Sequence, residues 1–268
     1  MAESNNSTII KIEDVSAVFQ GITAVDNVRF TLEKGKIYGL IGTNGAGKST
    51  LLNMISGNIH PTSGRILYKG KEINRSSSHT LAEKGIARTF QNLRLFGKET
   101  VIENVKVAGQ GKFRYSVLQM LFNTKTYRNA EKKLNRNSFE ILRNLDIEKY
   151  AERRADSLPY GIQRKTEIAR CLALNPNLLL LDEPAAGMNP KESVQLVKDI
   201  REVHKKNPEM TILIIEHDMK VVMSLCDYIY TMASGKIIDE GTPEEIQNSE
   251  KVIELYLGHG KYAESKRA

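Results

Sequence analysis

The sequence predicts an α/β fold with a parallel core sheet, an antiparallel β subdomain and an inserted helical subdomain. A glycine-rich loop stands between an apolar strand and a helix in residues 36–52. Apolar strands alternate with helices in residues 163–239, a pattern typical of a parallel sheet covered by helices. Residues 9–32 alternate apolar and polar positions instead, as half-buried antiparallel strands do.

Length and composition describe a chain that can fold around a proper core. It has 268 residues, 40% of them hydrophobic. It has no apolar run close to the roughly 20 residues that span a bilayer. The first eight residues are polar, unlike a secretion signal, so we expect a cytoplasmic protein. Cys171 and Cys226 lie far apart in apolar surroundings, which predicts buried reduced thiols.

The net charge of +7 and the pI of about 9.2 do not by themselves indicate a partner. Lysines and arginines are scattered among acids, as in residues 131–133 and 152–154. No basic stripe is interleaved with aromatic side chains, as on a nucleic-acid-binding face. We therefore expect no nucleic acid among the partners.

Residues 42–50 match a phosphate-binding loop. Glycines let backbone N–H groups turn inward around a phosphate, and the helix that follows offers its positive end to the anion. Lys48 reaches the terminal phosphates and Ser49 can hold Mg²⁺, which predicts a nucleoside triphosphate ligand and a P-loop NTPase fold. The predicted contacts are Gly42, Thr43, Asn44, Gly45, Ala46, Gly47, Lys48, Ser49 and Thr50.

The antiparallel part contains one further candidate contact. Residues 65–68 form a strand-like run bracketed by Gly64 and Gly70. Phe19 stands at a turn next to Gly21, where its ring is either a stacking platform for adenine or an ordinary core or turn aromatic. The sequence leaves both interpretations open.

Residues 86–91 read as a buried strand that ends in Gln91. The amide oxygen of this glutamine can bind Mg²⁺ or the attacking water, while its backbone hinges the next segment. From Val101 to Asp156 apolar residues recur three and four positions apart, which predicts a separate helical lobe. The residues with this spacing are Leu118, Leu121, Phe122, Leu134, Phe139, Leu142 and Leu145.

Two carboxylates follow the apolar strand 177–181. Asp182 and Glu183 fall at its carboxyl end, where open α/β sheets bind ligands. We expect Asp182 to hold Mg²⁺ through water and Glu183 to be the general base for the water that attacks the terminal phosphate. Without the phosphate loop, two solvated acids at a strand end would be the simpler interpretation.

The C-terminal half contains further strands and helices. His217 follows strand 211–215 and could hydrogen-bond the terminal phosphate, although a lone histidine there is more often structural. Asn189 and Thr242 are predicted to cap helices. The other expected elements are helix 163–174, a helix from 190 to about 206, helix 219–225, strands 228–232 and 236–239, and a final helix from 243.

These motifs, in this order, strongly resemble the nucleotide-binding subunit of an ABC transporter over nearly the whole chain. The matching positions are the phosphate loop, Gln91, the signature segment at 158–162, Leu178 to Glu183, the dimer loop at 187–189 and His217. The resemblance implies ATP as the nucleotide and Gln91, Glu183 and His217 as catalytic residues. It implies Ser49, Gln91 and Asp182 for Mg²⁺.

The resemblance also implies an assembly. Two ATP-binding subunits, alike or different, form a head-to-tail dimer in which each ATP lies between one phosphate loop and the opposed Pro159, Tyr160 and Gly161. Hydrolysis would drive transmembrane permease subunits at the cytoplasmic face of the membrane and, indirectly, serve an extracellular solute-binding protein. The helical lobe would receive a short helix from each permease, with Leu95, Phe96 and Glu103 as candidate contacts.

The signature segment departs from the Leu-Ser-Gly-Gly-Gln pattern of the family. Pro159 has neither a hydroxyl nor an N–H group, which leaves backbone donors around Gly161 for the opposed phosphate. This departure, Asn189 in the dimer loop, the helical insertion after Val101 and the ending at 256–258 resemble the branched-chain amino-acid importer branch.

We expect one cassette domain over residues 1–268. Residues 1–91 and 157–241 would form the ATP-binding core with its antiparallel layer, 92–156 the helical subdomain, and 242–268 a C-terminal helix and tail. A lipopolysaccharide-export ATPase, a cassette protein without a membrane partner and a P-loop kinase are the alternatives. The long insertion argues against the exporter, and the single cassette argues against the protein without a membrane partner. The signature segment argues against the kinase.

Overall fold

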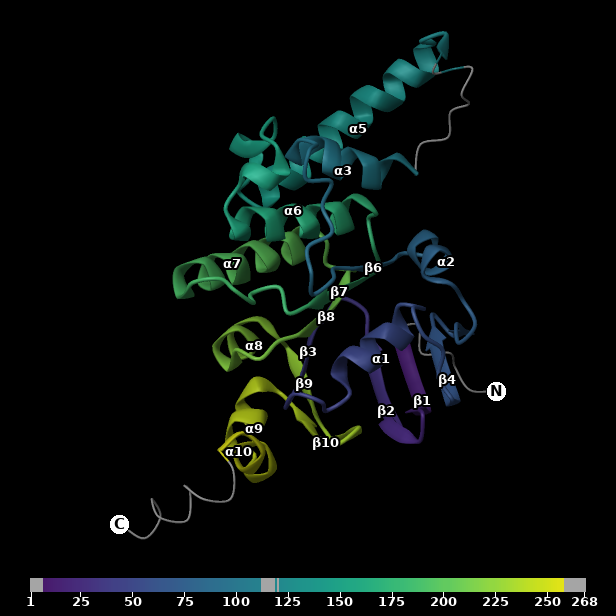
Figure 1. Cartoon of the computed structure of the whole chain (residues 1–268), viewed down its shortest axis with the longest axis vertical. Helices are drawn as coiled ribbons and strands as arrows, with labels where there is room; N and C mark the ends of the chain where they lie inside the picture. The colour runs from purple at the N-terminus through teal and green to yellow at the C-terminus, as the bar shows by residue number, and fades with distance from the viewer. Residues whose placement is uncertain (1–6, 112–118, 120, 258–268) are drawn as a thin grey trace.

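The computed structural model describes residues 7–111, 119 and 121–257. It has the predicted parallel core sheet, an antiparallel sheet beside it and a helical lobe above (Figure 1). The core sheet has the strand order β10-β9-β3-β8-β7-β6. Its strands are β3 (Ile37–Gly42), β6 (Ile86–Arg88), β7 (Leu178–Asp182), β8 (Thr211–Ile215), β9 (Tyr228–Ala233) and β10 (Lys236–Gly241).

The strand pairing confirms the predicted architecture. All neighbours in the core sheet run parallel except β10, which pairs antiparallel with β9 across the turn at Ser234 and Gly235. The second sheet has the order β2-β1-β4-β5 and is antiparallel throughout. Its strands are β1 (Thr8–Phe19), β2 (Ile22–Glu33), β4 (Ser63–Tyr68) and β5 (Lys71–Glu72).

Helices cover both faces of the core sheet and build the lobe. Those packed on the sheets are α1 (Lys48–Ile55), α2 (Ser78–Glu83), α7 (Pro190–Lys206), α8 (Met219–Leu225), α9 (Pro243–Asn248) and α10 (Glu250–Leu257). The lobe contains α3 (Val101–Gln110), α5 (Lys125–Asn144), two short 3₁₀ turns (Glu148–Tyr150 and Ala155–Ser157) and α6 (Tyr160–Ala173), which joins it to the core (Figure 1).

Continuous apolar strands bury both faces of the core sheet. In β7, Leu178 and Leu180 join the cluster shared with α1 and the antiparallel sheet, whereas Leu179 and Leu181 face the helices of the other layer. Successive strand residues point to opposite faces, so such a strand must be apolar at every position. Each of these leucines is 0–1% exposed, and burying one contributes roughly 1.5–3 kcal/mol.

Side-chain caps fix the first residues of two helices, as predicted. The Asn189 side chain accepts the N–H groups of Lys191 and Glu192, while Glu192 accepts the N–H group of Asn189. Thr242 and Glu245 form the same reciprocal pair at α9. Such boxes satisfy backbone donors that the first helical turn leaves without partners.

The single helix predicted from 243 is two helices, α9 and α10, on either side of Ser249. Two further boundaries are wrong by three residues. Strand β6 ends at Arg88 rather than at position 91, because buried side chains of α6 hold the backbone of Phe90 and Gln91 in place of a neighbouring strand. Helix α6 begins at Tyr160 rather than Gln163, with Pro159 at its N-cap. Proline suits the start of a helix because the first turn does not need its missing donor.

Part of the predicted apolar spacing in the lobe does not form a core. Leu121 and Phe122 are 72% and 74% exposed, since they precede the first residue of α5. Leu134, Leu142 and Leu145 are buried as expected, and Phe139 packs against the same cluster. Leu118 lies outside the described residues.

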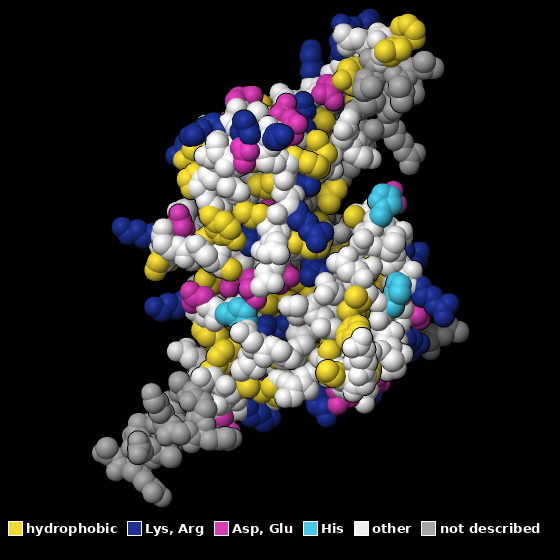
Figure 2. Space-filling view, viewed as in Figure 1, with side chains coloured by type: hydrophobic (Ala, Val, Ile, Leu, Met, Phe, Trp, Pro, Cys, Tyr) yellow, Lys and Arg dark blue, Asp and Glu magenta, His cyan; other side chains and the backbone are white. Residues whose placement is uncertain are grey.

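In the part of the chain that the structure describes, none of the helices is long and apolar enough to cross a lipid bilayer. Cys171 and Cys226 are both buried free thiols, as predicted. On the face in Figure 2, Lys and Arg side chains are interspersed with Asp and Glu.

Candidate nucleotide-binding site

The phosphate loop joins the end of β3 to the start of α1. Gly47 has a φ of 100° and occupies the N-cap of α1, where a Cβ atom would lie 2.3 Å from the carbonyl oxygen of Ala24. Only glycine fits this approach. No side chain caps α1, so the N–H groups of its first turn are available to an anion.

Lys48 turns back over the loop that it follows. Its Nζ donates to the carbonyl oxygens of Gly42 at 2.8 Å and Thr43 at 2.9 Å. Burial lowers the pKa of this lysine, while the nearby carboxylates of Glu183 and Asp182 act in the opposite direction. The loop therefore holds its cation at the place where phosphate is expected.

The three predicted catalytic side chains meet at Glu183. Nε2 of Gln91 donates to one carboxylate oxygen at 3.3 Å, and Nε2 of His217 lies 2.5 Å from the other. They come from the segment after β6, the end of β7 and the end of β8, which are neighbouring strands. The backbone φ of Glu183 is 48°, which lies in the left-handed region and not in the range of a β-strand. The chain therefore leaves the strand direction at this residue.

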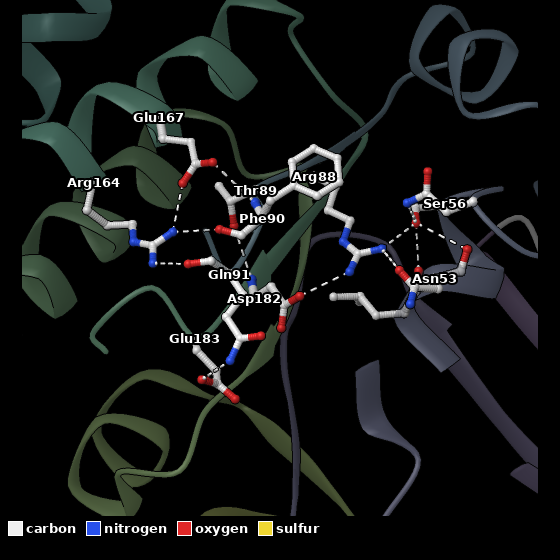
Figure 3. A network of polar contacts seen from close by, with 12 residues as sticks. Asn53, Ser56, Arg88, Thr89, Phe90, Gln91, Arg164, Glu167, Asp182 and Glu183 are labelled. Atoms are coloured by element: carbon white, nitrogen blue, oxygen red, sulfur yellow. Dashed lines mark hydrogen bonds and ion pairs between the residues drawn. The ribbon is translucent and has the colours of Figure 1, made fainter. Parts of the chain in front are cut away.

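Asp182 is buried and paired, which its sequence position did not reveal. Its Oδ2 accepts a bond from Nη2 of Arg88 at 3.0 Å, and Arg88 also donates to Asn53 and Ser56 of the α1 segment (Figure 3). Arg88 thus links β7 to the helix that follows the phosphate loop. A charged residue inside the apolar strand 86–88 was the signal that could have identified it.

A second buried arginine organises the glutamine segment. Arg164 of α6 is fully buried and donates to the carbonyl oxygens of Phe90 at 2.7 Å and Gln91 at 2.8 Å (Figure 3). It also pairs with Glu167 at 2.8 Å, and Glu167 accepts the N–H group of Phe90. Charge-assisted bonds of this kind are strong where water is excluded. Neither Arg164 nor Glu167 belongs to a motif that the sequence predicts.

Glu216 holds the backbone segments next to Glu183 and His217. Its carboxylate accepts the N–H group of Ala185 at 2.7 Å and that of His217 at 3.1 Å. Burial raises the pKa of Glu216, while these backbone donors favour its charged form. One buried carboxylate therefore positions both the turn after Glu183 and the start of the His217 segment.

The signature residues form the first turn of α6. The Tyr160 hydroxyl accepts a bond from Nη2 of Arg164 at 2.8 Å, and the Tyr160 ring lies beside Gly187 of the dimer loop. A Cβ atom on Gly161 would be 3.6 Å from the Glu192 carboxyl, which is ordinary contact. Pro159 and Tyr160 are exposed, whereas Gly161 is buried.

Phe19 lies at the end of β1 and is 45% exposed. That exposure rules out a core aromatic, and it leaves the adenine platform and the turn aromatic as the two interpretations. Among the loop residues, Thr43, Asn44, Gly45 and Ser49 are also exposed, whereas Ala46 is buried and Thr50 half-buried. The exposed side of the loop is thus the side available to a ligand.

The donor chemistry at the site fits Mg²⁺. Among the described residues, no three His, Cys, Asp or Glu side chains gather as metal ligands. The predicted set instead combines the Ser49 hydroxyl, the Gln91 amide oxygen and the Asp182 carboxylate. Mg²⁺ prefers oxygen donors and retains water, so few protein ligands suffice.

Two family models match this chain. The family model for the ABC transporter matches residues 25–186, and that for the branched-chain amino acid ATP-binding cassette transporter matches residues 236–262. The chain is 40% identical over 250 residues to the high-affinity branched-chain amino acid transport ATP-binding proteins BraF of Pseudomonas aeruginosa and LivG of Escherichia coli. Each match covers 93% of this chain and 98% of the relative.

Solved structures show the same fold. A nucleotide-free ATP-binding cassette from an ABC transporter is 34% identical, with a TM-score of 0.79 over 94% of this chain and 100% of that one. The ADP conformation of such a cassette is 33% identical, with a TM-score of 0.80 over 94% of this chain and 99% of that one. This chain therefore belongs to the ABC transporter family, as one of its ATP-hydrolysing cassettes.

Proposed function

We propose that the chain is the ATP-binding and ATP-hydrolysing subunit of a membrane importer for branched-chain amino acids. The observation that carries the catalytic part is the Glu183 carboxylate held between Gln91 and His217, next to the phosphate loop. The assignment of the transported solute rests on the 40% identity to BraF and LivG along nearly the full length of both chains.

The site residues divide the work of hydrolysis. Backbone N–H groups of the loop and the Lys48 ammonium bind the phosphates, while Glu183 accepts a proton from the attacking water. Gln91 and His217 orient the Glu183 carboxylate through their contacts with it. His217 would also hydrogen-bond the terminal phosphate. Ser49, Gln91 and Asp182 would hold Mg²⁺, which would supply positive charge next to the phosphate oxygens.

A head-to-tail dimer would complete the site. Position 159 has no hydroxyl to offer the opposed ATP, so we assign this contact to the backbone donors in the first turn of α6, which no side chain caps. The packing of Tyr160 on Gly187 supports a common role for the signature segment and the dimer loop, because a shift of one moves the other.

The expected membrane partners would dock on the helical lobe. Phe96 is 49% exposed and Leu95 half-buried, which suits a contact surface. Glu103 is exposed, but its carboxylate already accepts the N–H and hydroxyl groups of Thr100 in the capping box of α3. Phe96→Ala is therefore a cleaner probe of permease contact than charge reversal at Glu103. A position at the cytoplasmic face of the membrane follows from this docking.

The match of residues 236–262 to the branched-chain cassette model favours this function over the alternatives. No comparable match supports lipopolysaccharide export, kinase activity, or a role without membrane partners. The long α5 in the lobe agrees with the insertion expected of the importer branch.

Transport by reconstituted vesicles tests the proposal. The chain would be co-purified with the membrane subunits and solute-binding protein encoded beside it, and uptake of labelled leucine, isoleucine or valine would be measured with ATP inside. We expect ATP-dependent uptake that Glu183→Gln abolishes, and labelled glutamate serves as the solute control. ATP hydrolysis without uptake of any of the three would disprove the branched-chain assignment while leaving the ATPase assignment intact.

A further inference from the structure

The C-terminal helix reaches the phosphate loop through one hydroxyl group. The Tyr256 hydroxyl on α10 accepts the backbone N–H group of Gly42, at 2.9 Å. The two residues are separated by 214 positions in the sequence, and neither the phosphate-loop motif nor the capping pattern of the C-terminal helices predicts the contact.

Gly42 is the residue at which strand β3 becomes the loop. Its φ is 147°, and a Cβ atom here would lie 2.0 Å from the carbonyl oxygen of Met232 on β9, so the backbone has little freedom on that side. Its carbonyl oxygen accepts a bond from Nζ of Lys48 at 2.8 Å. Tyr256 and Lys48 therefore bind the N–H and C=O groups of the same residue.

Helix α10 also packs close to the histidine segment. Tyr256 borders an apolar groove between α8, α9 and α10. Helix α8 begins at Met219, two residues after His217. Ile246 of α9 and Val252 of α10 are buried in the same cluster as Val221 and Val222 of α8. The groove is lined by Met219, Lys220, Met223, Ile246, Gln247, Val252, Ile253 and Tyr256.

We propose that Tyr256 is a positioning residue for the phosphate loop, and that α10 thereby supports the loop and the His217 segment together. The inference rests on the proposed ATPase function, and it assigns a role within the site to the C-terminal segment that matches the branched-chain cassette model. The Tyr256 hydroxyl holds the first peptide of the loop in the orientation that nucleotide binding requires.

Removing this hydroxyl alters one bond and no charge. Burial raises the pKa of Tyr256, so the group is a neutral hydroxyl at physiological pH. Tyr256→Phe keeps the ring in the groove and leaves the Gly42 N–H group without this acceptor. The loss of one neutral hydrogen bond corresponds to a change of about fivefold in an equilibrium constant.

The test compares full-length wild type with Tyr256→Phe in nucleotide titrations and steady-state hydrolysis. We expect the Kd for ADP and the KM for ATP to rise about fivefold in the variant, with kcat unchanged. A purely structural role would lower the melting temperature without this separation of KM from kcat.

Tyr230→Phe is the matched control. Its hydroxyl donates to the carbonyl oxygen of Thr31 on β2 at 2.7 Å, a bond between the two sheets. It should lower the melting temperature and leave Kd and KM at wild-type values. Wild-type nucleotide affinity in Tyr256→Phe, or an equal loss of affinity in Tyr230→Phe, would overturn the inference. Failure of the wild type to bind ATP would instead remove the proposed function.

Discussion

The guanidinium of Arg164 donates to the carbonyl oxygen of Gln91 at 2.8 Å, so the helix that starts with the signature segment holds the glutamine predicted to be catalytic. Because Arg164 is fully buried and bridges two carbonyl oxygens and Glu167, no shorter cation can replace all of its bonds. The signature segment and Gln91 are thus expected to move as one body.

Arg164→Lys should therefore uncouple the two segments. We expect kcat to fall at least about tenfold with ADP affinity retained, because the ammonium cannot bond both carbonyl oxygens and Gln91 loses its position. Hydrolysis assays and calorimetry measure the two effects. Arg143→Lys is the control, since Arg143 forms an exposed pair with Glu148. Normal turnover in Arg164→Lys would show that this arginine only stabilises the lobe.

Substitutions of Lys48 and of Glu183 should impair different steps, nucleotide binding and hydrolysis respectively. Lys48→Ala removes the cation that the loop holds beside Gly42 and Thr43, and we expect loss of productive ATP binding. Glu183→Gln keeps the loop intact and should bind ATP while turnover falls by about 10²–10⁴-fold. ATP titrations and phosphate release distinguish them. Hydrolysis by Glu183→Gln near the wild-type rate would exclude Glu183 as the base.

His217→Ala should slow hydrolysis while leaving ADP affinity little changed, because the terminal phosphate it is expected to contact is absent from ADP. Its Nε2 is also 2.5 Å from Glu183, so the two side chains act as a unit. The double variant with Glu183→Gln should then be no slower than Glu183→Gln alone. Parallel losses of ADP affinity and turnover in His217→Ala would assign the histidine a structural role.

The signature segment can be tested with a small substitution. Gly161→Ala adds a Cβ atom in ordinary contact with Glu192, whereas Gly161→Asp would add a second carboxylate beside it. In a Glu183→Gln background we expect Gly161→Ala to bind ATP as a monomer but to dimerise less readily, by light scattering. Unchanged ATP-dependent dimerisation of Gly161→Ala and of Gly161→Asp would remove this segment from the interface.

The two thiols should be unreactive in the folded protein. Burial raises the pKa of Cys171 to about 12 and raises that of Cys226 as well, so almost no thiolate forms at pH 8. A colorimetric thiol reagent should titrate neither cysteine without denaturant and both in denaturant. Rapid reaction of either thiol in the native protein would show that its part of the core opens.

Much of the fold could be predicted because its signals are local. The phosphate loop is continuous from Gly42 to Thr50, and the Asn189 and Thr242 capping boxes each span four residues. Residues 178–181 of β7 are apolar at every position because both faces of the strand are covered. Asp182 and Glu183 could be predicted as site residues because they follow an apolar strand at the carboxyl end of a parallel sheet, whereas the roles of Gln91 and His217 were implied by the family resemblance.

The contacts between distant segments required the tertiary structure. No local pattern ends a strand at Arg88, because the residues that hold Phe90 and Gln91 lie more than 70 positions later, at Arg164 and Glu167. Sequence periodicity likewise could not separate the exposed Leu121 from buried leucines of the same lobe, since burial depends on what packs there.

The sequence alone thus determined the phosphate loop and the core sheet, since both depend on residues near one another or on the order of strands and helices. Only the tertiary structure decided how those parts are held. The bonds from Arg88 to Asp182, from Arg164 to Gln91 and from Gly42 to Tyr256 span 94, 73 and 214 positions. A hydrogen bond depends on the positions of two atoms in space, and chain folding, not residue spacing, brings these atoms together.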